Sequence, residues 1–126
     1  MEKGRGLSIP VLLLAACATL FARSRKAPTI TPEQAQAHIG QSVQVCGQVA
    51  RVHLAFKTRG QPTFIDFGQP YPHAPFTAII WSLDRALFDK PEKRYLNKRV
   101  CVTGPIKLYR GQPEVILHSP KQVKVK

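Results

Sequence analysis

From Gln41 onward, hydrophobic and polar residues alternate with a period of two, and many of the hydrophobic positions hold β-branched residues. This alternation is typical of strands that bury one face. It predicts five strands, at about residues 42–56, 63–67, 76–82, 99–108 and 113–117, with residues 122–125 as a candidate extension of the last strand. Gly47 interrupts the first strand, where we expect a bulge or a kink. The chain is therefore predicted to be mostly β.

Two segments depart from the alternation. The segment Thr31–Glu33 has the features of a helix start, with Thr at the cap and Pro at the first helical position, and this helix should end at Gly40. Between the third and fourth strands, Leu83, Leu87 and Phe88 fall on one face of a helical pattern. The spacings predict a short N-terminal helix and a short helical connection.

The length of the chain fits one domain, because 126 residues can bury one core but are too few for two ordinary domains. Three strands, a helical connection and two further strands, in this order, are the elements of an OB-fold, a small five-stranded Greek-key barrel. We therefore expect residues 31–126 to form an OB-fold domain, with one short helix at its N-terminus and another between strands three and four.

Several motifs coincide with the predicted strands. V-x-V-C-G-x-V follows Ile39–Gln41, and P-T-F-I-D-F-G, F-T-A-I-I-W, R-V-C-V-T-G-x-I and Y-R-G-Q-P-E-V-I-L come after it. Together they resemble the small bacterial OB-fold domains of nucleic-acid-binding type, which are found in exported proteins and beside nuclease domains. The resemblance covers about residues 39–125. It implies the barrel more specifically than the ligand, because the glycines and valines of these motifs serve curvature and core packing.

Residues 1–22 have the features of an export signal. Lys3 and Arg5 precede an apolar run, Leu7–Ala16, in the order that a secretory signal peptide requires. The whole apolar stretch, Leu7–Ala22, is shorter than the roughly 20 residues that span a bilayer. Export is therefore favoured over a transmembrane anchor.

Two outcomes of processing remain open. Leu14–Cys17 resembles a bacterial lipoprotein box, which predicts a lipid on Cys17, whereas Ala22 could end an ordinary signal peptide that contains the cysteine. Residues 23–30 then form a basic tether. We expect an exported protein of a bacterial cell envelope, either periplasmic or anchored to the membrane through the lipid.

The charge of the chain points to anionic partners. Its 19 Lys and Arg residues exceed its 7 Asp and Glu residues, so the net charge is +12, and the basic residues are spread along the whole sequence. Nucleic acid, phospholipid and acidic glycan are the partners that such a balance favours. Charge alone does not choose among them, and the sequence leaves the oligomeric state open.

Cys46 and Cys101 each lie in an alternating strand, on the face opposite the neighbouring valines. If the two strands are neighbours, the thiols can meet and form a disulfide in an oxidising compartment. The alternative is a pair of free or buried thiols. The sequence contains no C-x-x-C motif and no Cys/His cluster, so we expect no zinc site and no cofactor.

The binding surface of an OB-fold is the face of strands two and three together with the flanking loops. Both loops carry cations in this sequence, Lys57 and Arg59 after the first strand, and Lys107 and Arg110 around the turn between the last two strands. We expect these four residues to form a basic cleft that attracts the phosphate backbone of a nucleic acid.

Four aromatic residues are candidates for stacking on bases, namely Phe64, Tyr71, Trp81 and Tyr109. Tyr109 is the best of them, because its position at a turn should expose it. Phe64 and Trp81 could equally fill the barrel interior, since the run Ala78–Trp81 is apolar throughout. Tyr71 lies between two prolines and could pack within its own loop.

The sequence does not predict an enzyme. Its carboxylates and its four histidines show no paired or metal-ligand spacing, and it has no Gly-rich phosphate loop. Asp66 is the carboxylate that we expect to be partly buried. It should accept hydrogen bonds from the backbone or from a turn rather than take part in catalysis.

Two hypotheses for the function follow. The first is an exported OB-fold module that binds single-stranded or irregular nucleic acid, with little sequence preference. The alternative is a cell-envelope interaction protein that binds a protein or an anionic envelope polymer. Exposure of Phe64, Trp81 and Tyr109 in one basic cleft would favour nucleic acid, whereas a smooth cationic surface would favour the envelope polymer.

Overall fold

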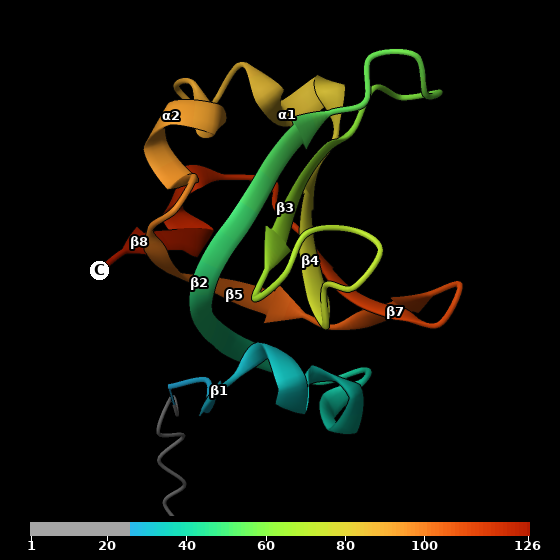
Figure 1. The fold of residues 1–126 in the computed structure, drawn as a ribbon. Coiled ribbons are helices and arrows are strands. Elements are labelled where there is room, and N and C mark those ends of the chain that lie inside the picture. The colour runs from blue at the N-terminus through green and yellow to red at the C-terminus, as the bar shows by residue number, and fades with distance from the viewer. Residues whose placement is uncertain (1–25) are drawn as a thin grey trace, which may run out of the picture.

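The computed structural model describes residues 26–126 of the chain. The predicted signal peptide, the candidate lipidation site Cys17 and the first part of the basic tether lie outside the described residues. The described chain consists mostly of strands (Figure 1), so the predicted mostly β fold is confirmed.

Strands and short helical turns follow one another in a fixed order. The elements are β1 (Thr29–Ile30), the 3₁₀ helix η1 (Pro32–His38), β2 (Ser42–Leu54), β3 (Thr63–Phe67), β4 (Phe76–Ile80), α1 (Ser82–Arg85), α2 (Pro91–Tyr95), β5 (Arg99–Pro105), β6 (Lys107–Tyr109), β7 (Gln112–Ile116), the 3₁₀ helix η2 (Pro120–Gln122) and β8 (Val123–Val125).

Hydrogen bonds join the strands in the order β6-β7-β4-β3-β2-β5-β8, with β1 beside β2. The long strand β2 bends, so that its first half pairs with β5 and its second half with β3 (Figure 1). The sheet has eight strands, and its order is an open path from β6 to β8. The prediction of a closed five-stranded barrel is therefore not confirmed in this form.

The predicted strand 99–108 is divided because Ile106 does not pair with another strand at the break. Its backbone N–H donates to the Gln41 carbonyl over 3.0 Å, and its carbonyl accepts from the Gly40 N–H over 2.8 Å. Proline at residue 105 also lacks the N–H that a continuing ladder needs. β5 and β6 are consequently separate strands, although one residue lies between them.

The period of two decides which side chains of β3 and β4 enter the core. Ile65, Phe67, Phe76, Ala78 and Ile80 are fully buried on the inner face. The rings of Phe67 and Phe76 pack edge to face, with their centroids 5.2 Å apart. The residues between these positions point to the opposite face of the sheet, where the groove described below lies.

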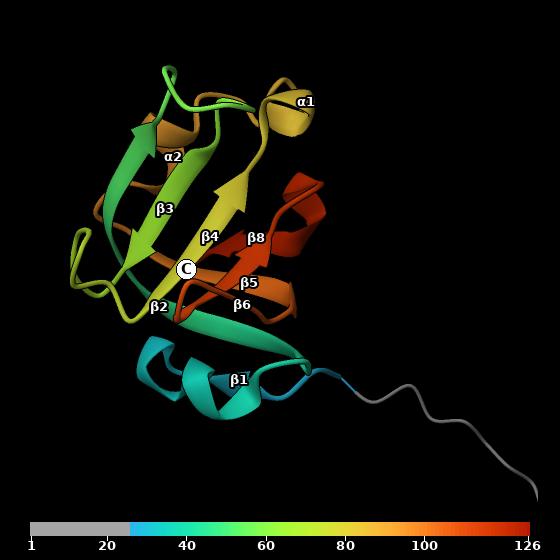
Figure 2. The same cartoon turned by 90° about the vertical axis from the view of Figure 1, so that its right-hand side faces the viewer.

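η1 covers one end of the sheet (Figure 2) and begins as predicted, with Thr31 at the cap and Pro32 in the first turn. The Thr31 N–H donates to the Gln34 side-chain oxygen over 2.8 Å. Pro32 and Ala35 are buried. The last two residues of the expected tether, Thr29 and Ile30, form β1 and pair in parallel with β2.

The irregularity of β2 lies beyond Gly47. The register against β3 shifts between Val49 and Arg51, which places a bulge at Ala50. Gly47 has another role, because a Cβ atom on it would lie 2.6 Å from Cγ of Pro32. The glycine allows η1 to approach the strand.

The predicted helical connection between the third and fourth strands forms as two short helices, α1 and α2. Of the three residues expected on one helical face, Leu83 is 93% and Leu87 59% exposed, and only Phe88 enters the core. The physical reason is that α1 ends at Arg85, so one continuous helical face does not form. In residues 26–126, no helix is long and apolar enough to cross a membrane.

Cys46 and Cys101 are direct register partners on β2 and β5, with their Cα atoms 4.0 Å apart. They form a disulfide that links positions 55 residues apart in the sequence. The predicted disulfide is therefore confirmed, and the alternative of two free thiols is wrong.

Candidate functional site

A groove of about 770 Å³ lies on the outer face of the sheet. Its floor consists of outward-facing residues of β2, β3, β4 and β7. Its walls come from the segment 55–62, the segment 70–74 and the turn between β6 and β7. This surface includes the β3 and β4 face that the sequence predicted as the binding surface.

Polar residues form one row across the floor of the groove. Register pairing places Arg51 of β2 opposite Asp66 of β3, Asp66 opposite Thr77 of β4, and Thr77 opposite Glu114 of β7. Lys107 of β6, which is not part of the groove lining, continues the row beyond Glu114. The row therefore has two carboxylates near its centre and a cation at each end.

A second, mostly apolar row lies next to the polar one. His53 pairs with Phe64, and Phe64 pairs with Ile79. All three line the groove, and Phe64 is half-buried. The period of two thus places Phe64 outside the core, which decides between the two positions that the sequence left open.

Asp66 is the most firmly held side chain of the floor and is 2% exposed. One carboxylate oxygen accepts from the Tyr71 backbone N–H over 3.0 Å, and the other accepts from the Thr77 hydroxyl over 3.3 Å. The expectation that Asp66 accepts hydrogen bonds from a nearby turn is therefore confirmed. Arg51 Nε lies 3.4 Å from the same carboxylate.

Gln112 connects the two sides of the floor. Its side-chain amide donates to the carbonyl oxygen of Ala74 over 2.9 Å and to the Thr77 hydroxyl over 3.2 Å. The contact fixes the segment after β3 to the start of β7, although the two are distant in the sequence. The groove wall near Ala74 is therefore held in place by side-chain bonds as well as by its own backbone.

Glu114 lies on the groove floor and is 9% exposed. Burial raises the pKa of its carboxyl above the ordinary value of 4.5, and the positive charge of Lys107 lowers this pKa in part. A carboxylate in this position repels phosphate. The middle of the floor is consequently better suited to neutral groups than to anions.

The aromatic candidates meet at the groove, because Phe64, Tyr71, Trp81 and Tyr109 all line it. Tyr71 is 72% and Tyr109 57% exposed. Trp81 is half-buried and packs on Gly60, where a Cβ atom would lie 2.9 Å from the indole ring. The exposed rings at the rim and the partly covered rings on the floor have faces that a flat ligand can contact.

Two arginines of the groove each lie beside a tyrosine ring. The Arg51 guanidinium carbon lies 5.8 Å from the centre of the Tyr71 ring, and that of Arg110 lies 5.3 Å from the centre of the Tyr109 ring. Both distances fall within the range of cation–π attraction. Each pair presents a cation and an aromatic ring together.

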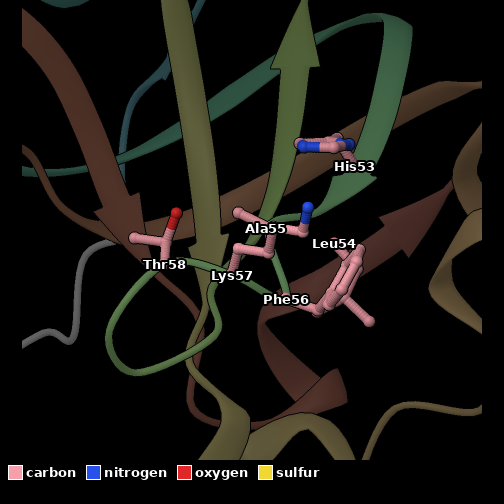
Figure 3. Close-up of a pocket in the computed structure, with 6 residues that line it drawn as sticks. All are labelled: His53, Leu54, Ala55, Phe56, Lys57 and Thr58. Carbon is pink, nitrogen blue, oxygen red and sulfur yellow. The ribbon is translucent and has the colours of Figure 1, made fainter.

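The predicted cations divide into two groups. Arg110 lines the groove, whereas Lys57, Arg59 and Lys107 lie outside its lining although they are exposed. Lys57 borders a smaller pocket of about 300 Å³ on the loop side of β2 (Figure 3), and its Nζ lies 5.8 Å from the Phe56 ring centre. The role of the four predicted cations as binding residues stays a prediction.

The histidines do not gather at the groove. His53 lines it, while His118 contacts Asp84 through Nδ1 over 2.9 Å at the start of the helical connection. Within residues 26–126, no three side chains of His, Cys, Asp or Glu lie close enough together to hold a metal ion.

Sequence reasoning missed six polar residues that the strands contribute to the groove. The register across strands was needed to join them, because alternation along one strand does not show which residues of other strands lie beside it. These residues are Arg51, His53, Asp66 as a groove residue, Thr77, Gln112 and Glu114.

Comparisons with known proteins add information on the fold. No family model matches the chain, and no curated protein matches it. Among solved structures, the OBody AM2EP06 bound to hen egg-white lysozyme aligns with a TM-score of 0.57 and 13% identity, over 82% of this chain and 96% of that chain. The OBody AM1L10 bound to hen egg-white lysozyme aligns with a TM-score of 0.54 and 13% identity, over 86% and 98%.

These scaffolds are OB-folds. The chain has an OB-fold-like architecture. A putative aspartyl-tRNA synthetase from Leishmania major Friedlin also aligns, with a TM-score of 0.56 and 10% identity, over 88% of this chain but only 23% of the synthetase. At such low identities the similarity concerns the fold alone.

Proposed function

We propose that this chain is a binding module that holds single-stranded or irregular nucleic acid in the groove on β3 and β4, with little overall sequence preference. The observation that carries the proposal is the convergence of Phe64, Tyr71, Trp81 and Tyr109 on one groove, from separate strands and loops. Aromatic rings that line a groove on a basic protein bind bases by stacking, which contributes about 1 to 3 kcal/mol per base.

The charges around the groove fit a strand whose bases face inward. Asp66 and Glu114 make the centre of the floor unfavourable for phosphates, whereas Arg110 provides positive charge at the rim. Lys57 and Arg59 lie on the neighbouring loop and extend this positive potential. We infer that the phosphate backbone follows the rim and that the bases enter the groove.

A duplex is a poorer ligand in this view, because its bases are stacked on one another and are not free to contact the four rings. Unpaired bases expose both faces and can insert between aromatic side chains. The net charge of +12 attracts either form at low salt. Preference for single strands would therefore come from stacking rather than from charge.

We also propose that the strands correspond to the five strands of an OB-fold. β5 pairs with β2, β6 pairs with β7, and β7 pairs with β4. If β5 and β6 are taken as one strand bent at Ile106, and the short strands β1 and β8 are set aside, five strands remain in the order of a Greek-key barrel. We infer that this bent strand corresponds to strand four of an OB-fold.

Export through the segment 1–22, with or without a lipid on Cys17, is a further part of the proposal. The disulfide between Cys46 and Cys101 supports it, because structural disulfides persist in oxidising compartments. A periplasmic or membrane-anchored module of a bacterial envelope would meet incoming or released nucleic acid. We also propose a binding role without catalysis.

One observation favours the alternative, a cell-envelope module that binds a protein or an anionic polymer. Two similar structures are OBodies bound to lysozyme, so a sheet of this architecture can bind a protein surface in those cases. Arg51 and Asp66 would also suit a protein partner with polar groups. The experiment below separates the two functions.

The test compares oligothymidine with heparin, a polyanion that lacks bases. The oxidised chain is titrated with fluorescent oligothymidine of 12 nucleotides and with labelled heparin at two salt concentrations. Tighter binding of the oligothymidine at matched charge supports nucleic-acid binding. Equal binding of both polymers, with loss of both near physiological salt, favours the envelope module instead.

A further inference from the structure

Arg51 enters the groove because of the bulge in β2. The bulge between Val49 and Arg51 reverses the alternation, so that Val52 packs against the core and Arg51 lies opposite Asp66. The arginine lines the groove, and its side chain is 33% exposed. The Arg51 side chain is therefore held by the strand at its backbone and remains partly accessible from the groove.

The carboxylate beside Arg51 is itself held in place. Asp66 accepts from the Tyr71 N–H and from the Thr77 hydroxyl, so it cannot turn away from the arginine without breaking those bonds. The Arg51 guanidinium carbon lies 5.8 Å from the centre of the Tyr71 ring. The ion pair with Asp66 and this cation–π contact restrain the side chain, so less conformational entropy is lost when a ligand binds.

Arg51 also carries a donor that lacks an acceptor. Its Nε is buried and has no hydrogen-bond partner among residues 26–126, although the Asp66 oxygen lies 3.4 Å away as an ion pair. Buried donors are nearly always paired in proteins. Because Nε is closed to solvent beside Asp66, a ligand acceptor in the groove would have to bind the terminal amino groups of the guanidinium.

A phosphate is the weaker of the two acceptors that a nucleic acid offers here. Asp66 offsets the charge of Arg51 at close range, and Glu114 adds a second carboxylate in the same row. The attraction of a phosphate depends on net positive charge, which this neighbourhood lacks. A neutral base edge depends instead on the direction of the N–H donors, which the contacts of Arg51 preserve.

We propose that Arg51 is a specificity-determining residue that binds a guanine base at one position of the strand. This inference rests on the proposed function and deepens it. Guanine presents two adjacent acceptors, O6 and N7, to the parallel donors of a guanidinium, whereas adenine presents a donor beside N7. The preference concerns one position and is compatible with low specificity along the rest of the strand.

The test uses three 12-nucleotide strands that differ at one central base. The host is oligothymidine, and the guests carry a single guanine or a single adenine, which avoids guanine quadruplexes. The measured quantity is the ratio of the two guest affinities for the full oxidised chain. We expect guanine to bind roughly tenfold more tightly than adenine.

Variants locate the effect. Arg51→Gln should reduce the guanine-to-adenine ratio to about one, and Arg51→Lys, which keeps the charge but loses the planar donor array, should do the same. Arg99→Gln is the matched control, because Arg99 is exposed on β5 and lies outside the groove lining. This control should leave the ratio unchanged while it removes the same charge.

Three results would overturn the inference. Equal binding of the guanine and adenine guests by the native chain would end it and leave the proposed function standing. An equal loss for all three strands in Arg51→Gln would show a phosphate contact instead. Binding of none of the strands would overturn the proposed function as well. Circular dichroism shows whether each variant is folded. If Arg51→Gln does not fold, the ratio measured with Arg51→Lys decides the test.

Discussion

The ring of Pro32 in η1 lies directly against Gly47 of β2, so closely that a Cβ at residue 47 would be 2.6 Å from Cγ of the proline. The proline ring is rigid and buried. It cannot rotate away as the end of a flexible side chain would. The pair therefore fixes how near the N-terminal helix approaches the sheet.

Gly47→Ala should destabilise the folded chain by about 1 to 3 kcal/mol, because an added methyl group forces either η1 or β2 to move. Urea denaturation measures the change. The double variant Gly47→Ala with Pro32→Ala tests the cause. Without the proline ring, Gly47→Ala should lower the free energy of unfolding by less than it does in the native chain. Strictly additive effects would contradict the contact.

Loss of the disulfide should lower the stability by up to about 4 kcal/mol, the value that the chain-entropy model gives for a link across 55 residues. The comparison is urea denaturation of the native chain with and without reductant, together with the double variant Cys46→Ala, Cys101→Ala. The double variant should not respond to reductant. Identical midpoints for the oxidised and reduced native chain would refute the prediction.

Tyr109→Ala and Tyr71→Ala should each weaken the binding of oligothymidine by about 5- to 150-fold if the ring stacks on a base. Both side chains are exposed, so the fold should tolerate their truncation. Leu108→Ala is the matched control, because Leu108 is 49% exposed on the same strand as Tyr109 and does not line the groove. Equal losses in the control and in Tyr109→Ala would exclude stacking at this turn.

Binding in the groove should change the fluorescence of Trp81, which is the only tryptophan of the chain. The indole lines the groove, so a base that enters should alter its surroundings and reduce its emission. Heparin, which has no bases, should leave the emission nearly unchanged. An oligothymidine that binds tightly without any change in emission would place its bases away from Trp81.

Glu114 should make the stability depend on pH. Burial raises its pKa in the folded chain above 4.5, so the folded state holds the proton more tightly than the unfolded state. Stability therefore falls as the pH rises from about the ordinary value through the raised pKa. Glu114→Gln lacks this titration, and its stability relative to the native chain should increase across the same window.

The measurement for Glu114 is the urea midpoint at pH 4 and at pH 7. Glu33→Gln is the control, since Glu33 is exposed on η1 and is not part of the groove lining. Lys107→Gln should strengthen the pH dependence, because the lysine opposes the rise of the pKa. The assignment fails if Glu114→Gln and the native chain follow the same pH profile.

The period of two was enough to predict much of the sheet. It predicted Thr63–Phe67 as a strand with both of its observed ends, and it placed Cys46 and Cys101 on matching faces of two strands. Local alternation sufficed in these cases, because the side of the sheet that each residue faces follows from its neighbours. The division of the predicted strand 99–108 depended on the backbone contacts of Ile106, which leave no mark in the pattern.

The candidate site was only partly predictable for a related reason. Counting from Val43, Val45 and Val49 places residue 51 on the inner face, but the bulge reverses the count and turns Arg51 toward the groove. One extra residue in a strand leaves no clear trace in the composition. Glu114 was missed because its neighbours in the polar row come from strands distant in sequence.

The disulfide has a consequence for how the chain responds to cleavage. The bond closes a covalent ring over residues 46–101, which contains β3, β4 and the exposed segments 56–61 and 68–73. A protease that cuts one of these segments would therefore produce a nicked molecule whose two pieces stay joined. The rim of the groove could be opened in this way without the release of a fragment, until a reductant separates the pieces.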